Sequence, residues 1–184
     1  QDFVAGIPNC MVIDSNSIDT TKKIVGKFGS DLIRFYYGHD LIGNEIGAAA
    51  KNVVGIAAGM LDGLNLTSLK GALMARGTRE VSRLIKAMGG DEITAYGLCH
   101  LGDYEATLFS EHSHNRNFGK AFVTGQHFPK LAEGVETVKA LMMLSKDNKV
   151  DLPICYAVYS MIFEGGDPDY ILENMFLRSI KYEF

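Results

Sequence analysis

The residue in this sequence best placed to do chemistry is Lys51, which interrupts the apolar run from Ile46 to Leu61. A lysine inside an apolar helix must extend its stem to water, pair with a carboxylate or give up its proton more easily, because an unpaired buried ammonium costs several kcal/mol. A solvated lysine needs no function, whereas a desolvated one can hold or transfer a proton near neutral pH. Asn52, a second polar residue beside it, favours a site.

Asp103 is the carboxylate that we expect to face Lys51. It stands in Leu101-Gly102-Asp103, where the glycine permits a tight turn. An aspartate that only caps this turn is the alternative without chemistry. If the two side chains pair, each explains the presence of the other.

Further along the chain, Ser113-His114-Asn115-Arg116 places several hydrogen-bond donors in a row. Such a run suits a small phosphate, although a solvated loop could have the same composition. Glu111, His112 and His114 offer no third ligand at a known metal spacing, so we expect no metal site.

The elements that hold these residues are expected to be mostly helices. Residues 10–13, 18–28 and 32–37 have the pattern of a strand, a helix and a second strand, which predicts a β-α-β unit. Two parallel strands cannot stand alone, so the unit should belong to a larger sheet. After Asp40 the periodicity of apolar residues predicts helices over 44–63, 67–88, 91–98, 131–142, 153–163 and from 168 onwards.

Several details of these helices are expectations in their own right. Three glycines in the helix over 44–63 predict that another helix or a ligand approaches its backbone closely; they are Gly47, Gly55 and Gly59. The helix over 67–88 should be capped by Thr67 or Ser68 and should carry Glu80 on its polar face. Residues 100–119 are polar and are expected to be irregular, as suits a site.

The composition is that of one folded domain, with 47% hydrophobic and 22% charged residues in a chain of 184. The formal net charge of -4 argues against nucleic acid or an anionic membrane as a partner, because neither gains from an acidic surface. We expect no membrane span, since polar residues interrupt the longest apolar run. The chain begins without Met, so we expect it to be trimmed from a longer parent. The cysteines indicate free buried thiols in a cytoplasmic protein; they are Cys10, Cys99 and Cys155.

A series of ordered motifs resembles those of the NAD(P)-dependent glycerol-3-phosphate dehydrogenases over almost the whole chain. No single motif is decisive, but their order and spacing together are specific. The motifs are Glu45-Ile-Gly-Ala-Ala-Ala-Lys51-Asn52-Val-Val, Gly63, Ala72-Leu-Met-Ala-Arg76-Gly77, Leu101-Gly102-Asp103, Ser113-His-Asn115-Arg-Asn-Phe-Gly119, Ala132-Glu133-Gly134-Val and Leu152-Pro153-Ile-Cys.

The resemblance implies a mainly α fold, with a multi-helix substrate-binding domain over residues 40–184 of the 6-phosphogluconate dehydrogenase C-terminal-like type. Residues 1–39 would be the C-terminal remnant of a Rossmann-type nucleotide-binding domain. No Gly-x-Gly-x-x-Gly follows a strand here, so NAD or NADP would be bound mainly by a missing N-terminal domain, and this piece alone should not turn over. The choice between the two cofactors, and a homodimer, stay open at this point.

The resemblance also implies an activity, the reversible reduction of dihydroxyacetone phosphate to sn-glycerol 3-phosphate for phospholipid synthesis. Lys51 would be the general acid/base on the C2 oxygen, and Asp103 would be its partner. The cofactor would be contacted by His114 and Glu133. Substrate oxygens would be bound by a further set, Asn52, Thr107, Ser113, His114 and Asn115.

The chain departs from the family at His114, where the family has Arg in a Ser-Arg-Asn-Arg motif. A histidine is shorter and offers no bidentate fork, so phosphate binding should be weaker unless Arg116 or a protonated His114 compensates. Leu98-Cys99-His100 and Tyr104-Glu105 also depart from the more apolar family residues around the aspartate. Two alternatives therefore stay open. One is a non-catalytic module that keeps the fold for dimerisation or small-phosphate binding, and the other is a dehydrogenase for another small hydroxy acid.

Overall fold

The computed structural model describes residues 4–176 and residue 182. Its helices and strands follow the order that the sequence predicts, with one further helix over residues 114–123, and they confirm a mainly α chain with a β-α-β unit at its start. The regular elements are β1 (Asn9–Ile13), α1 (Ile18–Phe28), β2 (Ile33–Tyr37), α2 (Leu41–Gly63), α3 (Lys70–Ala87), α4 (His114–Val123), α5 (Gly134–Asn148), α6 (Pro153–Phe163) and α7 (Pro168–Phe176). Short 3₁₀ helices lie at η1 (Thr67–Leu69), η2 (Glu92–Tyr96) and η3 (Leu101–Asp103), and a π-helical turn lies at η4 (Glu105–Phe109).

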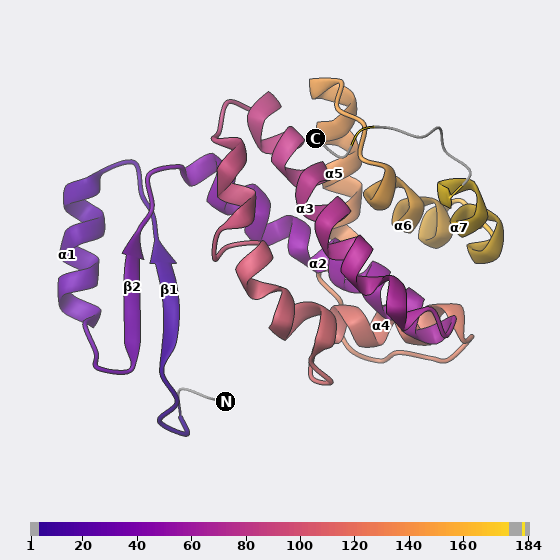
Figure 1. Ribbon diagram of the computed structural model, residues 1–184, viewed down its shortest axis with the longest axis horizontal. Helices are drawn as coiled ribbons and strands as arrows, with labels where there is room; N and C mark the ends of the chain where they lie inside the picture. The colour runs from indigo at the N-terminus through magenta and orange to yellow at the C-terminus, as the bar shows by residue number, and fades with distance from the viewer. Residues whose placement is uncertain (1–3, 177–181, 183–184) are drawn as a thin grey trace.

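The β-α-β unit stands to one side of the helical body, with α1 on the side of the strands that faces away from it (Figure 1). β1 and β2 are parallel, and their paired residues run from Asn9 with Ile33 to Ile13 with Tyr37. Ser17 caps α1, since its side chain accepts from the Thr20 amide. The sheet has only these two strands within the described residues.

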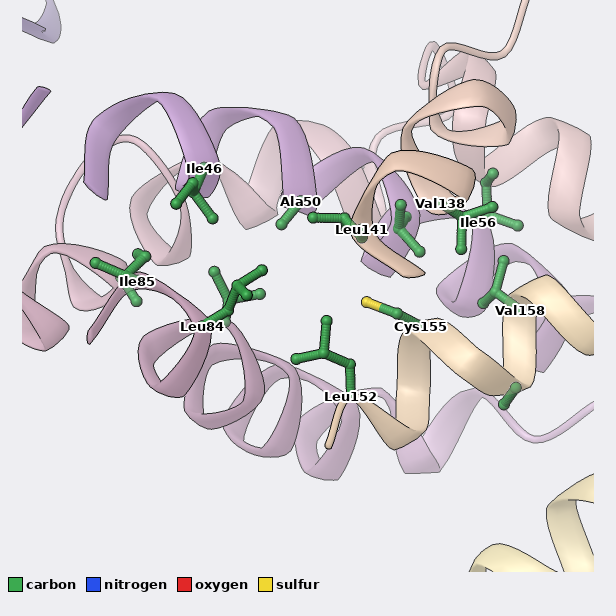
Figure 2. Packing of buried hydrophobic residues seen from close by; sticks show 14 of the residues in the cluster. Ile46, Ala50, Ile56, Leu84, Ile85, Val138, Leu141, Leu152, Cys155 and Val158 are labelled. Atoms are coloured by element: carbon green, nitrogen blue, oxygen red, sulfur yellow. The ribbon is translucent and has the colours of Figure 1, made fainter. Parts of the chain in front are cut away.

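Helix α2 is the central element of the helical body. It begins three residues before the predicted Asn44, because Asp40 caps it by accepting from the Gly43 amide at 3.0 Å. Side chains of α3, α5 and α6 pack against those of α2 to form one core, and Figure 2 shows them pointing into the space between these helices. Burial of each such aliphatic side chain contributes about 2 kcal/mol. The core includes Ile46, Ala50, Val53, Ile56, Val81, Leu84, Ile85, Val138, Leu141, Leu152, Cys155 and Val158.

Helices α2 and α4 touch backbone to backbone. A Cβ atom on Gly59 would overlap the Arg116 carbonyl oxygen, and one on Gly119 would overlap the Ile56 carbonyl oxygen. The predicted close approach to the α2 glycines is thus confirmed, and its consequence is local. It brings the first turn of α4, with Asn115, against the face of α2 that carries Lys51.

Changing Gly119 to alanine tests this contact. Alanine is the better helix former, but its methyl group would collide with the backbone of α2, so we expect the free energy of unfolding to fall by about 2 to 3 kcal/mol. Gly26 of α1 is the matched control, because a Cβ there meets nothing within 4 Å. Gly26→Ala should raise stability by up to about 1 kcal/mol. Urea unfolding of both variants measures the difference, and equal stabilities would contradict the close contact.

The structure corrects the prediction that residues 100–119 are irregular. They contain η3, η4 and the first half of α4. Helix α4 starts at His114 because the Ser113 hydroxyl accepts from the Arg116 amide at 3.3 Å, which is a helix cap. The polar side chains at this start conceal the helical pattern in the sequence.

The prediction for Glu80 is also wrong, since its side chain is buried at 2% exposure. Its carboxylate accepts from the amides of Ile154 at 2.8 Å and Cys155 at 2.9 Å, and so it holds the first turn of α6 onto α3. Burial raises the pKa of Glu80, against these hydrogen bonds. Pro153 does begin α6, as predicted.

Two smaller expectations fail in the same way. Neither Thr67 nor Ser68 caps α3, and the Thr67 hydroxyl donates to Asp62 instead. Cys10 is exposed on β1 rather than buried, whereas Cys155 is buried and Cys99 is half-buried. Among the described residues, no helix combines the length and the apolar character needed to cross a membrane.

Candidate active site

The predicted pair of Lys51 and Asp103 forms in the structure. Lys51 lies midway along α2, Asp103 ends η3, and the Lys51 Nζ donates to Asp103 Oδ2. The two side chains are 22% and 36% exposed, so the pair sits at the edge of the helical core rather than inside it. Burial lowers the pKa of Lys51, while the negative charge of Glu133 acts in the opposite direction. The arrangement can therefore hold a proton at a position that solvent and a small molecule can reach.

Asp103 is held by its own backbone. Its amide donates to the His100 carbonyl at 3.1 Å, and its carbonyl accepts the Thr107 hydroxyl at 2.8 Å. Thr107 is 7% exposed, and its methyl group packs against the α2 backbone at Gly55. The structure thus brings Thr107 next to the pair, with its hydroxyl proton already engaged.

Beside the pair, the amides of Asn52 and Asn115 connect three helices. Asn115 Nδ2 donates to Asn52 Oδ1 at 3.1 Å, and Asn52 Nδ2 donates to Glu133 Oε2 at 3.4 Å. The Gly134 amide donates to Asn115 Oδ1 at 2.9 Å, at the start of α5. Asn52, Asn115 and Glu133 were each predicted from the sequence, and the structure places them in one row next to Lys51.

Ser113 and His114 lie at the start of α4. The Ser113 hydroxyl caps the helix, and His114 is exposed with its ring edge-on to Phe128, at 6.3 Å between ring centroids. Both are predicted site residues, and they lie next to Asn115 at one end of the row formed by Asn52, Asn115 and Glu133. A small anion placed there would meet the helix N-terminus as well as these side chains.

A charge cluster that sequence reasoning missed lies next to the start of α4. Arg116 Nε donates to Asp62 at 2.6 Å, and Lys70 Nζ lies 2.7 Å from the same carboxylate. The Asp62 and Lys70 side chains are 7% and 4% exposed. Arg116 also donates to the carbonyls of Phe109 and Ser110, and Lys70 to that of Leu108. Arg116 is therefore already engaged and is poorly placed to replace the family arginine at position 114.

The fold and the site together define a class, a helical domain built around a long central helix that carries a lysine-aspartate pair at the edge of the core. The chain belongs to the family described as NAD-dependent glycerol-3-phosphate dehydrogenase C-terminus, whose model matches residues 40–173.

Curated relatives and solved structures agree with this family. A glycerol-3-phosphate dehydrogenase of Clostridium botulinum (strain Eklund 17B / Type B) is 36% identical over 191 residues, which cover 100% of this chain and 58% of that protein. One of Thermus thermophilus is 40% identical over 171 residues, covering 90% of this chain and 53% of the relative. The crystal structure of glycerol-3-phosphate dehydrogenase from Coxiella burnetii matches with a TM-score of 0.89 at 28% identity, over 96% of this chain and 57% of that one. The chain thus spans little more than half the length of the relatives it matches.

Proposed function

We propose that the full-length parent of this chain is an oxidoreductase that interconverts dihydroxyacetone phosphate and sn-glycerol 3-phosphate with NAD(P)H. The observation that carries the proposal is the ion pair of Lys51 and Asp103 beside the row formed by Asn52, Asn115 and Glu133. Family membership supplies the substrate, and the names of the relatives supply the cofactor class.

In this proposal Lys51 is the general acid/base. Its ammonium would donate a hydrogen bond to the C2 carbonyl oxygen and then transfer its proton to that oxygen as negative charge develops there. The nicotinamide cofactor, when bound, supplies the hydride that adds to C2. In the reverse direction the amine would accept the proton of the C2 hydroxyl. Asp103 would hold the ammonium in place and keep it protonated between turnovers.

The neighbouring polar residues would bind the substrate. The amide nitrogens of Asn52 and Asn115 each carry a second hydrogen, which we assign to substrate oxygens, with Thr107 behind them. Ser113 and His114 would bind the phosphate at the start of α4. Because Asp62 holds Arg116, we infer weaker phosphate binding than an arginine at position 114 would give.

The cofactor would be held mostly outside this chain. The described residues contain two parallel strands with one crossover helix, which is only part of the sheet that a dinucleotide needs. Glu133 is exposed and accepts a hydrogen bond from Asn52, so it would contact the nicotinamide half, together with the exposed His114. The free cysteines of the chain fit a reducing compartment, and we place the parent in the cytoplasm.

The test is an assay of the purified full-length parent with dihydroxyacetone phosphate and either NADH or NADPH. We expect cofactor oxidation that requires the phosphorylated substrate, with dihydroxyacetone itself at least about a hundredfold poorer in kcat/KM, because the phosphate contacts are lost. Small 2-keto acids serve as the competing substrates. Turnover of one of these alone would show a dehydrogenase for another hydroxy acid.

A second candidate is a non-catalytic module that binds a small phosphate compound. Two observations favour it, the histidine at position 114 and the engagement of Arg116 by Asp62. A folded full-length parent that binds glycerol phosphate by calorimetry but turns over no substrate with either cofactor would support this candidate against the enzyme.

A further inference from the structure

His100 is a fully buried polar side chain next to the pair of Lys51 and Asp103, and the proposed mechanism does not use it. Its exposed fraction is 0%. Its ring makes two hydrogen bonds, from Nδ1 with the Gly47 carbonyl at 2.9 Å and from Nε2 with the Tyr104 hydroxyl at 2.7 Å. The Tyr104 side chain is also buried, and its ring meets that of His100 edge-on at 4.9 Å.

The two hydrogen-bond partners of His100 determine which of its ring nitrogens carries the hydrogen. A carbonyl can only accept, so Nδ1 carries the hydrogen and Nε2 must accept from Tyr104. The neighbouring Thr78 hydroxyl donates to the Met74 carbonyl at 2.8 Å and lies 3.5 Å from the Tyr104 oxygen, to which it is also a donor, so the Tyr104 hydrogen is left for Nε2. Burial lowers the pKa of His100 to about 4, helped by the positive charge of Lys51, and burial raises the pKa of Tyr104. The imidazole is therefore neutral and held in one orientation at physiological pH.

The hydrogen bonds of His100 reach the backbone close to both members of the ion pair. Gly47 precedes Lys51 by one turn of α2, and in an α-helix its carbonyl is also the acceptor for the Lys51 amide. On the other side, the His100 carbonyl accepts the Asp103 amide. His100 thus bonds the turn before the lysine through its ring and the turn that ends in the aspartate through its backbone.

Steric contacts make this arrangement specific. A Cβ atom on Gly47 would lie 2.9 Å from Cys99 Sγ and 3.2 Å from His100 Cβ, so the segment packs directly on the α2 backbone. His100 and Tyr104 belong to the two segments around Asp103 that we expect to depart from the family sequence, and they bond to each other. Loss of either member of such a buried polar pair costs stability, since the other is left with an unsatisfied group.

We propose that His100 is a positioning residue, which sets the separation of Lys51 and Asp103 by tying the η2–η3 segment to the α2 backbone at Gly47. The inference rests on the proposed function only for its effect on turnover. Without the ring, the turn that carries Asp103 can move relative to α2, and a displacement of about 1 Å at a catalytic group costs up to about a hundredfold in rate.

Three variants of the full-length parent separate positioning from general stability. His100→Leu removes both hydrogen bonds, and His100→Asn keeps a donor near Nδ1. Tyr104→Phe is the matched control, because it disturbs the same buried network but leaves the bond to Gly47. We expect His100→Leu to lower kcat about ten- to a hundredfold with KM for dihydroxyacetone phosphate changed less than about threefold. We expect His100→Asn to recover most of the loss, and Tyr104→Phe to keep kcat within about threefold.

A second readout needs no catalysis. The titration of the Lys51 side chain in this chain can be followed by NMR of its Cε and Nζ atoms. We expect His100→Leu to lower the pKa of Lys51 by about half a unit or more, because the carboxylate moves away while the lysine stays in α2, and Tyr104→Phe to leave it unchanged. If His100→Leu and Tyr104→Phe change kcat and this titration equally, His100 only stabilises the fold and the inference fails. An inactive parent in which the Lys51 titration still shifts would refute the proposed function and leave the positioning role standing.

Discussion

Replacing Lys51 by methionine in the full-length parent should lower turnover of dihydroxyacetone phosphate by about a thousandfold. Methionine keeps the length and the apolar stem but has no proton to give, and loss of a general acid costs about a hundred- to ten-thousandfold. Lys51→Ala should behave in the same way. Lys51→Arg should also be slow, because arginine keeps the charge but does not release its proton. Steady-state kinetics with saturating NADH or NADPH measure these effects.

The control for this prediction is Lys86→Met. Lys86 pairs with Glu92 on the surface, with 66% of its side chain exposed, and its loss should leave turnover unchanged. The pH profile gives a further check, since in the proposed mechanism reduction needs the protonated lysine, and burial lowers the pKa of Lys51. Reduction should therefore decline with rising pH at values below 10.5, the ordinary lysine pKa. A Lys51→Met enzyme that keeps more than about a tenth of the activity would remove the lysine from the mechanism.

Changing Asp62 to alanine should cost about 3 to 5 kcal/mol of stability, the largest folding effect that we expect in the helical body. The change leaves Lys70 and Arg116 as two largely buried cations without their shared carboxylate. Urea or thermal unfolding of this chain measures the loss. Glu92→Ala, which breaks the exposed pairs with Lys86 and Arg79, is the control and should cost less than about 1 kcal/mol.

The pH dependence of stability follows from the same carboxylate. Burial alone would raise the pKa of Asp62, but the hydrogen bonds from Lys70 and Arg116 outweigh it and hold the pKa below 3.8. A carboxylate with a lowered folded pKa contributes stability above its ordinary pKa and loses it as the pH falls through the lowered value. The wild-type chain should thus lose stability below about pH 4, and Asp62→Ala should lack this part of the acid dependence. Similar acid unfolding and similar stability in both proteins would exclude the cluster as a stabilising element.

The pair of Lys51 and Asp103 could be predicted because its signal is local. Lys51 is the charged residue in a long apolar run, so its anomaly is visible without knowing the fold. Asn52 beside it and the turn at Asp103 give similar short-range signals. The β-α-β unit was equally clear, since strand and helix periodicities change at glycines and polar caps.

The supporting network could not be predicted, because its burial depends on several helices at once. Asp62 and Lys70 lie next to apolar residues near helix ends and Arg116 lies in a polar stretch, and the three side chains meet only where α2, α3 and α4 come together. The burial of Glu80 could not be predicted for the same reason, since the pattern of α3 places it on the solvent-facing side and only the packing of α6 covers it. His100 gives a weak signal as a histidine among small and apolar residues, but its partner on α2 is remote in sequence.

The contact of Glu80 with the first turn of α6 has a consequence for how the protein behaves in different solvents. Dissolved ions weaken attraction between charges that water surrounds, over distances of about 8 Å at physiological ionic strength. The carboxylate of Glu80 is out of their reach, because its partners are main-chain amides that α3 and α6 enclose together. A high salt concentration should therefore weaken the exposed ion pair of Lys86 and Glu92 but leave the hydrogen bonds between Glu80 and the first turn of α6 intact.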